Sequence, residues 1–157
     1  MQVVLNALDN KNFLSCVNSL NRPEARVHFA EELTLFSKCA IDISDGLVAD
    51  LGHIVSASFC GANIKLEDIP LSSATRHYFD FYHKSSIDWS MVLTQGDDYE
   101  LCFTVNKENE SAVMVLAKKH QLKVSCIGEV TESAELVFHD DNNELIQFKN
   151  TGFKHFK

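Results

Sequence analysis

Two carboxylates, separated by two residues, stand where a short apolar run gives way to a helical pattern. Asp42 and Asp45 flank Ile43 and Ser44, and a glycine follows at once. Hard oxygen ligands of this kind suit Mg²⁺, which in proteins usually binds one or two carboxylates together with substrate phosphates. The partial positive charge at a helix amino terminus also attracts phosphate. The segment 42–45 is therefore a candidate site for a metal ion and a phosphate group.

The same segment has a purely structural interpretation. Serine and aspartate are preferred immediately before a helix, where the side-chain oxygen accepts a hydrogen bond from the first turn. On spacing alone, Ser44 or Asp45 acting as a helix cap is the more common case. Composition does not decide between these two interpretations.

A second acidic pair precedes a strand pattern. Asp97 and Asp98 follow Gly96, and residues 99–105 then alternate apolar with polar side chains, which predicts a strand with one face in the core. Two adjacent acids before a strand usually form a solvated turn. The alternative is a loop carboxylate that a rigid sheet presents to a ligand.

Other candidate residues carry weaker signals. Phe153 lies beside a glycine in the terminal segment 151–156, where it could pack on the core or stack on a heteroaromatic ring. Asp50 and His53 are one helical turn apart, which more often indicates a surface pair than a metal site. The sequence contains no HExxH, GxSxG or P-loop motif, so zinc proteases, serine hydrolases and Walker-type nucleotide binding have no support.

Charge and composition limit the partners. The 157 residues include 22 acidic and 14 basic side chains, a formal net charge of -8, which argues against nucleic acid binding. Phosphorylated metabolites would also be repelled unless divalent cations mediate the contact. The five cysteines form no paired or zinc-ligand spacing, which indicates reduced, mostly buried thiols in a cytoplasmic protein. No apolar run approaches the ~18 to 20 residues of a membrane span, so we expect no membrane partner.

Hydrophobic periodicity predicts alternating helices and strands. One expected helix follows Pro23 and uses Phe29, Leu33, Phe36 and Ala40 as its buried face. A helix beginning near Leu47 should end at Cys60-Gly61, and residues 90–98 should form a loop. The remaining expected helices span 3–20, 72–83 and 108–120, and the expected strands span 39–43, 62–66, 99–105, 123–130, 135–139 and 144–149. This order predicts an α/β (α+β) layered sandwich of a mixed β-sheet with helices, without internal repeats.

Seven segments in order resemble one known family. They read IDISDGL, DLGHI, CGANI, IPLS, GDDYELCFTV, CIGEV and TGFKHF. Together they are similar to the carboxyl-terminal domain of thiamine-monophosphate kinases, in the aminoimidazole ribonucleotide synthetase superfamily. The resemblance covers residues 22–157, with 1–21 as a connecting helical segment. The amino-terminal domain of that family has no counterpart here, so the resemblance implies one wall of an active site, inactive or nearly so alone.

The resemblance assigns roles to residues. It implies transfer of the ATP γ-phosphate to thiamine monophosphate, giving thiamine diphosphate with Mg²⁺ as cofactor, in a full-length protein that forms a homodimer. Asp42 and Asp45 match metal ligands, Ser44 matches an ATP contact, and no side chain matches a catalytic acid or base. Asp97 stands where the family usually has a glutamate that contacts the thiamine substrate, one methylene longer. Phe153 matches an aromatic residue that packs against that substrate.

Two alternatives stay open at the level of sequence. In the first, the chain is a stand-alone binding or assembly module, with its acids serving as helix caps and an exposed apolar face contacting another protein. In the second, the chain belongs to another branch of the same superfamily, such as selenophosphate synthetase or a hydrogenase-maturation protein. The combination of ISDGL, DYEL and the terminal TGF favours the thiamine enzyme.

Overall fold

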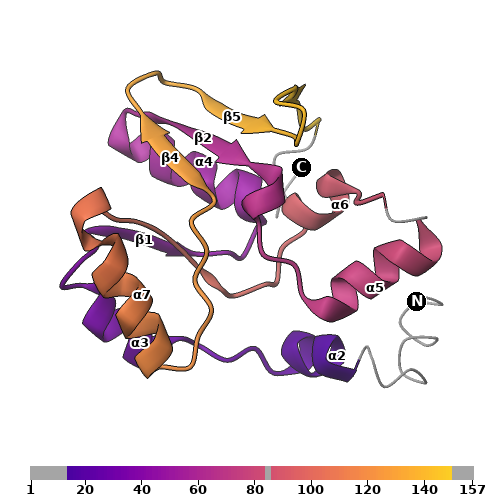
Figure 1. The fold of residues 1–157 in the computed structure, drawn as a ribbon, viewed down its shortest axis with the longest axis horizontal. Coiled ribbons are helices and arrows are strands. Elements are labelled where there is room, and N and C mark those ends of the chain that lie inside the picture. The colour runs from indigo at the N-terminus through magenta and orange to yellow at the C-terminus, as the bar shows by residue number, and fades with distance from the viewer. Residues whose placement is uncertain (1–13, 84–85, 150–157) are drawn as a thin grey trace, which may run out of the picture.

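The structure, a computed structural model, describes residues 14–83 and 86–149 (Figure 1). The terminal segment with Phe153, and most of the helix expected at 3–20, lie outside the described residues. The helices are α2 (Leu14–Asn21), α3 (Val27–Leu33), α4 (Leu47–Ser58), α5 (Ser73–Tyr82), α6 (Trp89–Leu93) and α7 (Glu110–Lys119), with short 3-10 helices at Leu66–Asp68 and Lys107–Asn109. The strands are β1 (Cys39–Asp42), β2 (Gly61–Lys65), β3 (Leu101–Thr104), β4 (Gly128–Thr131), β5 (Leu136–His139) and β6 (Leu145–Ile146).

These elements form stacked layers. Strands β1 and β3 pair antiparallel, while a second sheet has the order β4-β2-β5-β6. That sheet is mixed, because β2 runs parallel to β5 and antiparallel to β4. Helix α4 contacts both β1 and β2 and so lies between the two sheets, with α3 and α7 beyond β1 and β3 (Figure 1). The predicted α/β sandwich with a mixed sheet is confirmed.

The β1–β3 pair separates two hydrophobic cores. Ile41 is opposite Cys102 in the register, and both pack against the core around α4. Leu101 and Phe103 pack instead against the core between α3 and α7. Residues of β3 thus contact both cores, which corrects the expectation of a strand with only one face in the core. The larger core contains Leu47, Val48, Leu51, Ile54, Val55, Ala62, Ile64, Leu66, Ile69, Leu93 and Phe138, and the smaller one Phe29, Leu33, Val113, Leu116 and Ala117.

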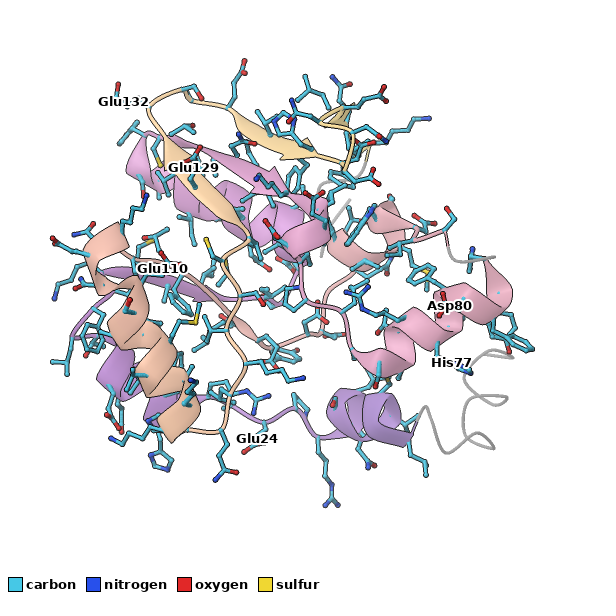
Figure 2. All side chains as sticks on the ribbon, viewed as in Figure 1. Glu24, His77, Asp80, Glu110, Glu129 and Glu132 are labelled. Atoms are coloured by element: carbon cyan, nitrogen blue, oxygen red, sulfur yellow. The ribbon has the colours of Figure 1, made fainter. Side chains whose placement is uncertain are left out.

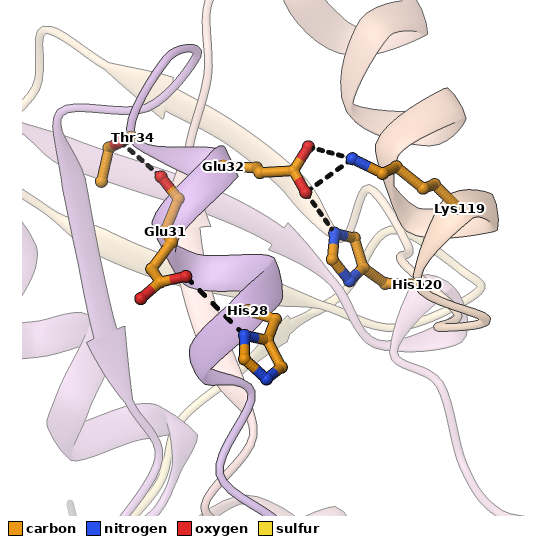
Figure 3. Close-up of polar contacts among 6 residues, drawn as sticks. All are labelled: His28, Glu31, Glu32, Thr34, Lys119 and His120. Atoms are coloured by element: carbon orange, nitrogen blue, oxygen red, sulfur yellow. Dashed lines mark hydrogen bonds and ion pairs between the residues drawn. The ribbon is translucent and has the colours of Figure 1, made fainter.

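Ionic contacts link the two helices that border the smaller core (Figure 3). The Glu32 carboxylate of α3 accepts hydrogen bonds from Lys119 Nζ at 2.7 and 2.6 Å, and its Oε1 lies 3.0 Å from His120 Nε2. The Phe29 ring lies edge-on to the His120 ring, with 5.9 Å between centroids. Apolar packing and polar contacts therefore act on the same pair of helices.

Several boundaries differ from the sequence prediction, among them the strand expected at 144–149, which covers only Leu145–Ile146. Helix α3 ends at Leu33, and Ala40 lies in β1 rather than on the helix face. Helix α6 occupies part of the expected loop, because Asp88 caps it by accepting a hydrogen bond from Met91 N at 3.0 Å. The carboxyl end of α4 has Phe59 in the left-handed conformation, so no glycine ends this helix. The strand expected at 123–130 begins only at residue 128.

Two expectations about the whole chain can be compared with the structure. All five cysteines are free, four of them half-buried and Cys126 exposed, so the expectation of mostly buried thiols was wrong. Within residues 14–83 and 86–149, every helix is too short or too polar to cross a membrane.

Candidate functional site

Backbone hydrogen bonds join the two acidic segments. Ile43 exchanges bonds with the second segment: its N–H donates to Glu100 O at 2.8 Å, and its carbonyl accepts from Tyr99 N at 2.8 Å. One residue further, Ser44 O accepts from Asp97 N at 3.0 Å. These bonds extend the β1–β3 pairing into the loops beyond it. The residues that sequence analysis singled out in two separate motifs therefore lie side by side.

Glycine is required where these loops touch. A Cβ atom on Gly96 would lie 1.9 Å from Ser44 O, which no side chain can occupy. Gly46 has a φ of 107°, and a Cβ there would lie 2.9 Å from the carbonyl oxygens of both Leu93 and Gln95. Residues 42–46 and 93–99 are hereafter called the paired loops, and around Ser44 and Gly46 they pack backbone against backbone.

Acidic side chains gather around one phenol in the paired loops. Asp97 and Tyr99 both have positive φ, 69° and 53°, which is uncommon outside glycine. The Tyr99 hydroxyl donates to Asp97 Oδ1 at 3.1 Å. This hydrogen bond, the Asp97 charge, burial and the charges of Asp42 and Asp45 all raise the pKa of Tyr99. The Tyr99 phenol thus lies within electrostatic range of carboxylates from both acidic motifs.

The neighbouring Asp98 carboxyl group has a raised pKa. Burial of the Asp98 carboxyl, with smaller effects from the charges of Glu100 and Asp97, raises its pKa to about 6. The residue is exposed overall, so this effect comes from desolvation of the carboxyl group itself. Glu100 binds Arg26 through two bonds of 3.1 and 2.7 Å, whereas Asp98 has no ion-pair partner within the described part of the chain.

The helix-cap interpretation of the first motif is wrong. Gly46 is the residue before α4, and no side chain caps the helix. Ser44 and Asp45 instead donate their backbone N–H groups to Asp50 Oδ2, at 2.9 and 3.0 Å. Asp50 is 2% exposed, so its expected surface pairing with His53 is wrong as well. Potential ligand atoms of Asp45, Asp50 and His53 nevertheless lie within 4.8 Å of one another.

For the second motif, the expectation of a solvated turn is met only in part, and the alternative of a carboxylate presented to a ligand stays a prediction. Asp97 and Asp98 are exposed, as expected of a solvated turn, yet the backbone of this turn is bound to residues 43 and 44. Sequence analysis did not single out Tyr99, although its position between two acids was a usable signal. It also mistook the role of Asp50, because nothing local in the sequence indicates that a helical side chain turns back to the preceding loop.

The donor set of the paired loops fits a hard divalent cation. Asp42 and Asp45 offer carboxylate oxygens, which Mg²⁺ prefers, and Asp97 adds negative charge nearby. Asp42 and Asp45 could therefore hold Mg²⁺, with Ser44 between them.

Comparison with known proteins identifies the family. The family described as AIR synthase related protein, C-terminal domain, matches residues 20–141. The chain belongs to this family.

Particular relatives share one name. The chain is 38% identical over 159 residues to the thiamine-monophosphate kinase of Buchnera aphidicola subsp. Schizaphis graminum, covering 97% of this chain and 48% of that protein. The crystal structure of thiamine-monophosphate kinase from Stenotrophomonas maltophilia K279a is similar at a TM-score of 0.74 and 33% identity, covering 84% of this chain and 40% of that one. A structure of AaThiL complexed with AMPPCP and TMP gives a TM-score of 0.76 at 26% identity, over 98% of this chain and 46% of that one.

These comparisons confirm the resemblance found in the sequence. They also give its extent, because the chain spans less than half the length of each of these three proteins.

Proposed function

We propose that this chain forms one wall of the active site of a thiamine-monophosphate kinase. That enzyme would transfer the γ-phosphate of ATP to thiamine monophosphate and release ADP and thiamine diphosphate. Support comes from the relatives that carry this name, and from the similar structure that contains AMPPCP, an ATP analogue, and TMP. The observation that carries the proposal is the set of backbone hydrogen bonds that brings both acidic motifs into the paired loops.

The proposed division of roles follows the chemistry of each side chain. Asp42 and Asp45 would hold Mg²⁺, and the Ser44 hydroxyl would contact ATP. A bound Mg²⁺ neutralises negative charge on phosphate oxygens during phosphoryl transfer, which is mainly a matter of positioning and charge. The residues of this chain would bind and orient the two anions. No side chain of the chain is proposed as a general acid or base.

Asp97 is proposed to contact the thiamine substrate. Its carboxylate is exposed and held by the Tyr99 hydroxyl at 3.1 Å, so its direction is restrained. A carboxylate here would attract the positively charged thiazolium ring of thiamine. Because aspartate is one methylene shorter than the glutamate usual in the family, a water molecule would bridge any remaining gap. The proposed second contact, Phe153, lies outside the described residues.

The remaining proposals concern the whole protein. We propose that this domain works together with the part of the relatives that lies beyond the match, that the complete protein is a homodimer, and that it acts in the cytoplasm, where ATP and Mg²⁺ are abundant. Phe59 and Phe81 are 93% and 73% exposed, and exposed aromatic side chains of this kind fit positions that another domain or subunit covers. The same exposure favours the alternative of an assembly module, for which the acids would be dispensable.

The central test replaces the proposed metal ligands in a protein that joins this chain to the remaining part of a relative. Asp42→Asn and Asp45→Asn should lower the rate of thiamine diphosphate formation by orders of magnitude, since charge neutralisation by metal is worth several kcal/mol. The matched control is Asp80→Asn, an exposed acid on α5 (Figure 2), which should leave the rate unchanged. Normal turnover in both site variants would favour the assembly module.

The chain alone should be nearly inactive. Incubated with ATP, Mg²⁺ and thiamine monophosphate, it should form no measurable thiamine diphosphate and bind Mg²⁺ and ATP only weakly, because much of the site would lie in the part beyond the match. Rapid turnover by residues 1–157 would contradict this division of the active site.

A further inference from the structure

A buried side chain behind the candidate site holds its backbone. Asp50 lies in the first turn of α4 and is 2% exposed. Its Oδ2 atom accepts hydrogen bonds from the N–H groups of both Ser44 and Asp45, at 2.9 and 3.0 Å. A buried carboxylate needs such donors, because an unpaired charge away from water is costly. Asp50 therefore ties α4 to the two residues that carry candidate ligands.

This arrangement reverses an ordinary helix cap. In a cap, a side chain before the helix accepts from an N–H group inside it. Here a side chain inside the helix accepts from two consecutive N–H groups before it, while Asp50 N itself donates to Gly46 O at 3.0 Å. The turn between β1 and α4 is thus closed from the helix side by a single carboxylate.

The opposite side of the same turn is held by the second loop. Ser44 O accepts from Asp97 N at 3.0 Å, and Gly96 packs directly against that carbonyl. The peptide groups on both sides of Ser44 are therefore fixed, one through its N–H and the other through its C=O. With the backbone held in this way, the Cα–Cβ bonds of Ser44 and Asp45 have fixed directions, from which their staggered rotamers extend.

We propose that Asp50 is the positioning residue of this site: it orients Ser44 and Asp45 toward metal and nucleotide without contacting either. The proposal rests on the function proposed above. Residues that orient metal ligands typically change metal affinity by about 10 to 100-fold when they are replaced. Asp50 should therefore affect cation binding although its Oδ2 is fully engaged with the protein backbone.

A rival role can be tested at the same time. Because ligand atoms of Asp45, Asp50 and His53 lie within 4.8 Å of one another, Asp50 could instead bind the metal directly through its other oxygen. His53 is exposed and does not contribute to the hydrogen bonds around Ser44. Its replacement should weaken cation binding only if this direct role holds.

The experiment uses the ¹⁵N-labelled chain and two readouts. The first is hydrogen exchange at the Ser44 and Asp45 amides without any added ligand. The second is the affinity for Mn²⁺, used as a paramagnetic substitute for Mg²⁺, from the broadening of amide signals. The variants are Asp50→Ala, Asp50→Asn and His53→Ala, with Asp80→Asn as the control for loss of one acid. Thermal unfolding gives the folded fraction of each variant.

Asp50→Ala should accelerate exchange at both amides and weaken Mn²⁺ binding by about 10 to 100-fold. Asp50→Asn keeps an oxygen that can accept these bonds, so it should lie between Asp50→Ala and the unchanged chain in both readouts. His53→Ala and Asp80→Asn should match the unchanged chain.

Three outcomes would overturn the proposal. Slow exchange that persists in Asp50→Ala would mean that Asp50 does not hold the turn. An equal loss of Mn²⁺ affinity in both Asp50 variants and in His53→Ala would make Asp50 a metal ligand. Fast exchange at the Ser44 and Asp45 amides of the unchanged chain would exclude their hydrogen bonds to Asp50, and this result does not require that either Asp50 variant folds.

A different outcome bears on the proposed function. Absence of Mn²⁺ binding by the unchanged chain would count against that function, while the exchange measurement would still decide whether Asp50 holds the turn.

Discussion

The contact between α3 and α7 and the contact between the paired loops differ in what holds them together. The helices meet through buried apolar side chains such as Phe29 and Leu116, with ion pairs of Glu32 outside them. The paired loops meet through backbone hydrogen bonds, with glycines at the points of closest approach. Side chains stabilise the first contact, whereas backbone groups stabilise the second.

This difference explains why the acids gather in the loops. Backbone hydrogen bonds and the buried Asp50 carboxylate fix these loops, and the carboxylates of Asp42, Asp45 and Asp97 lie near Tyr99. The positive φ at Asp97 and Tyr99 adds local strain, of the kind found at functional sites. Replacements in the helices should therefore affect stability, and those in the loops should affect binding.

The largest effect on stability is expected in the smaller core. Phe29→Ala should lower the free energy of unfolding by about 3–5 kcal/mol, because Phe29 is 3% exposed and its removal leaves a cavity. Urea unfolding measures this loss. The fraction that remains folded should bind Mn²⁺ with unchanged affinity, and a parallel loss of affinity would show that the two regions are not independent.

A pair of glycines tests the backbone contact itself. Gly96→Ala should destabilise the protein by roughly 1–3 kcal/mol and abolish Mn²⁺ binding, because its Cβ would lie 1.9 Å from Ser44 O. Gly52→Ala, inside α4 with open space around it, should stabilise by about 0.4–1 kcal/mol. Thermal unfolding of the two variants should show opposite shifts. Similar shifts would mean that the paired loops tolerate a side chain.

The raised pKa of Asp98 predicts a dependence of stability on pH. Because the folded chain binds this proton more tightly than the unfolded chain, the charged Asp98 opposes folding above about pH 6, and this cost disappears as the pH falls from 6 to about 4. As the pH falls through that interval, the free energy of unfolding of the unchanged chain should therefore rise relative to that of Asp98→Asn. Saturating Mg²⁺ should reduce the difference. A stability difference that does not vary with pH would contradict the desolvation of this carboxyl.

The smallest effect is expected at the ion contacts of Glu32. Hydrogen bonds from Lys119, and then from His120, hold the pKa of Glu32 below its usual value. These contacts therefore stabilise the fold at pH values above the usual pKa of a glutamate, and the stabilisation is lost as the pH falls through the lowered pKa. Glu32→Gln should cost little, because these contacts are exposed and screened by salt. Unfolding at low and high salt measures this. A loss of stability as large as that of Phe29→Ala would show that the ionic contacts, rather than packing, hold the two helices together.

Local patterns in the sequence explain why part of this architecture was predictable. The apolar spacing over α4 and the short apolar run of β1 each identify their element without knowledge of the rest of the chain. Both acidic motifs were also visible as motifs. Their proximity, however, depends on the register that sets Asp42 opposite Leu101, and no local pattern encodes an antiparallel pairing across nearly sixty positions. The positive φ of Asp97 and Tyr99 was equally hidden, since neither is a glycine.

The central claim is that the paired loops form one cation site, and Mn²⁺ added to the ¹⁵N-labelled chain tests it most directly. Amide signals of residues 42–46 and 96–99 should broaden together with a single affinity, while those of α3 and α7 stay sharp. Asp42→Asn should remove both effects at once. Broadening confined to one loop, or spread evenly over the acidic surface, would mean that the two motifs are neighbours without forming a site.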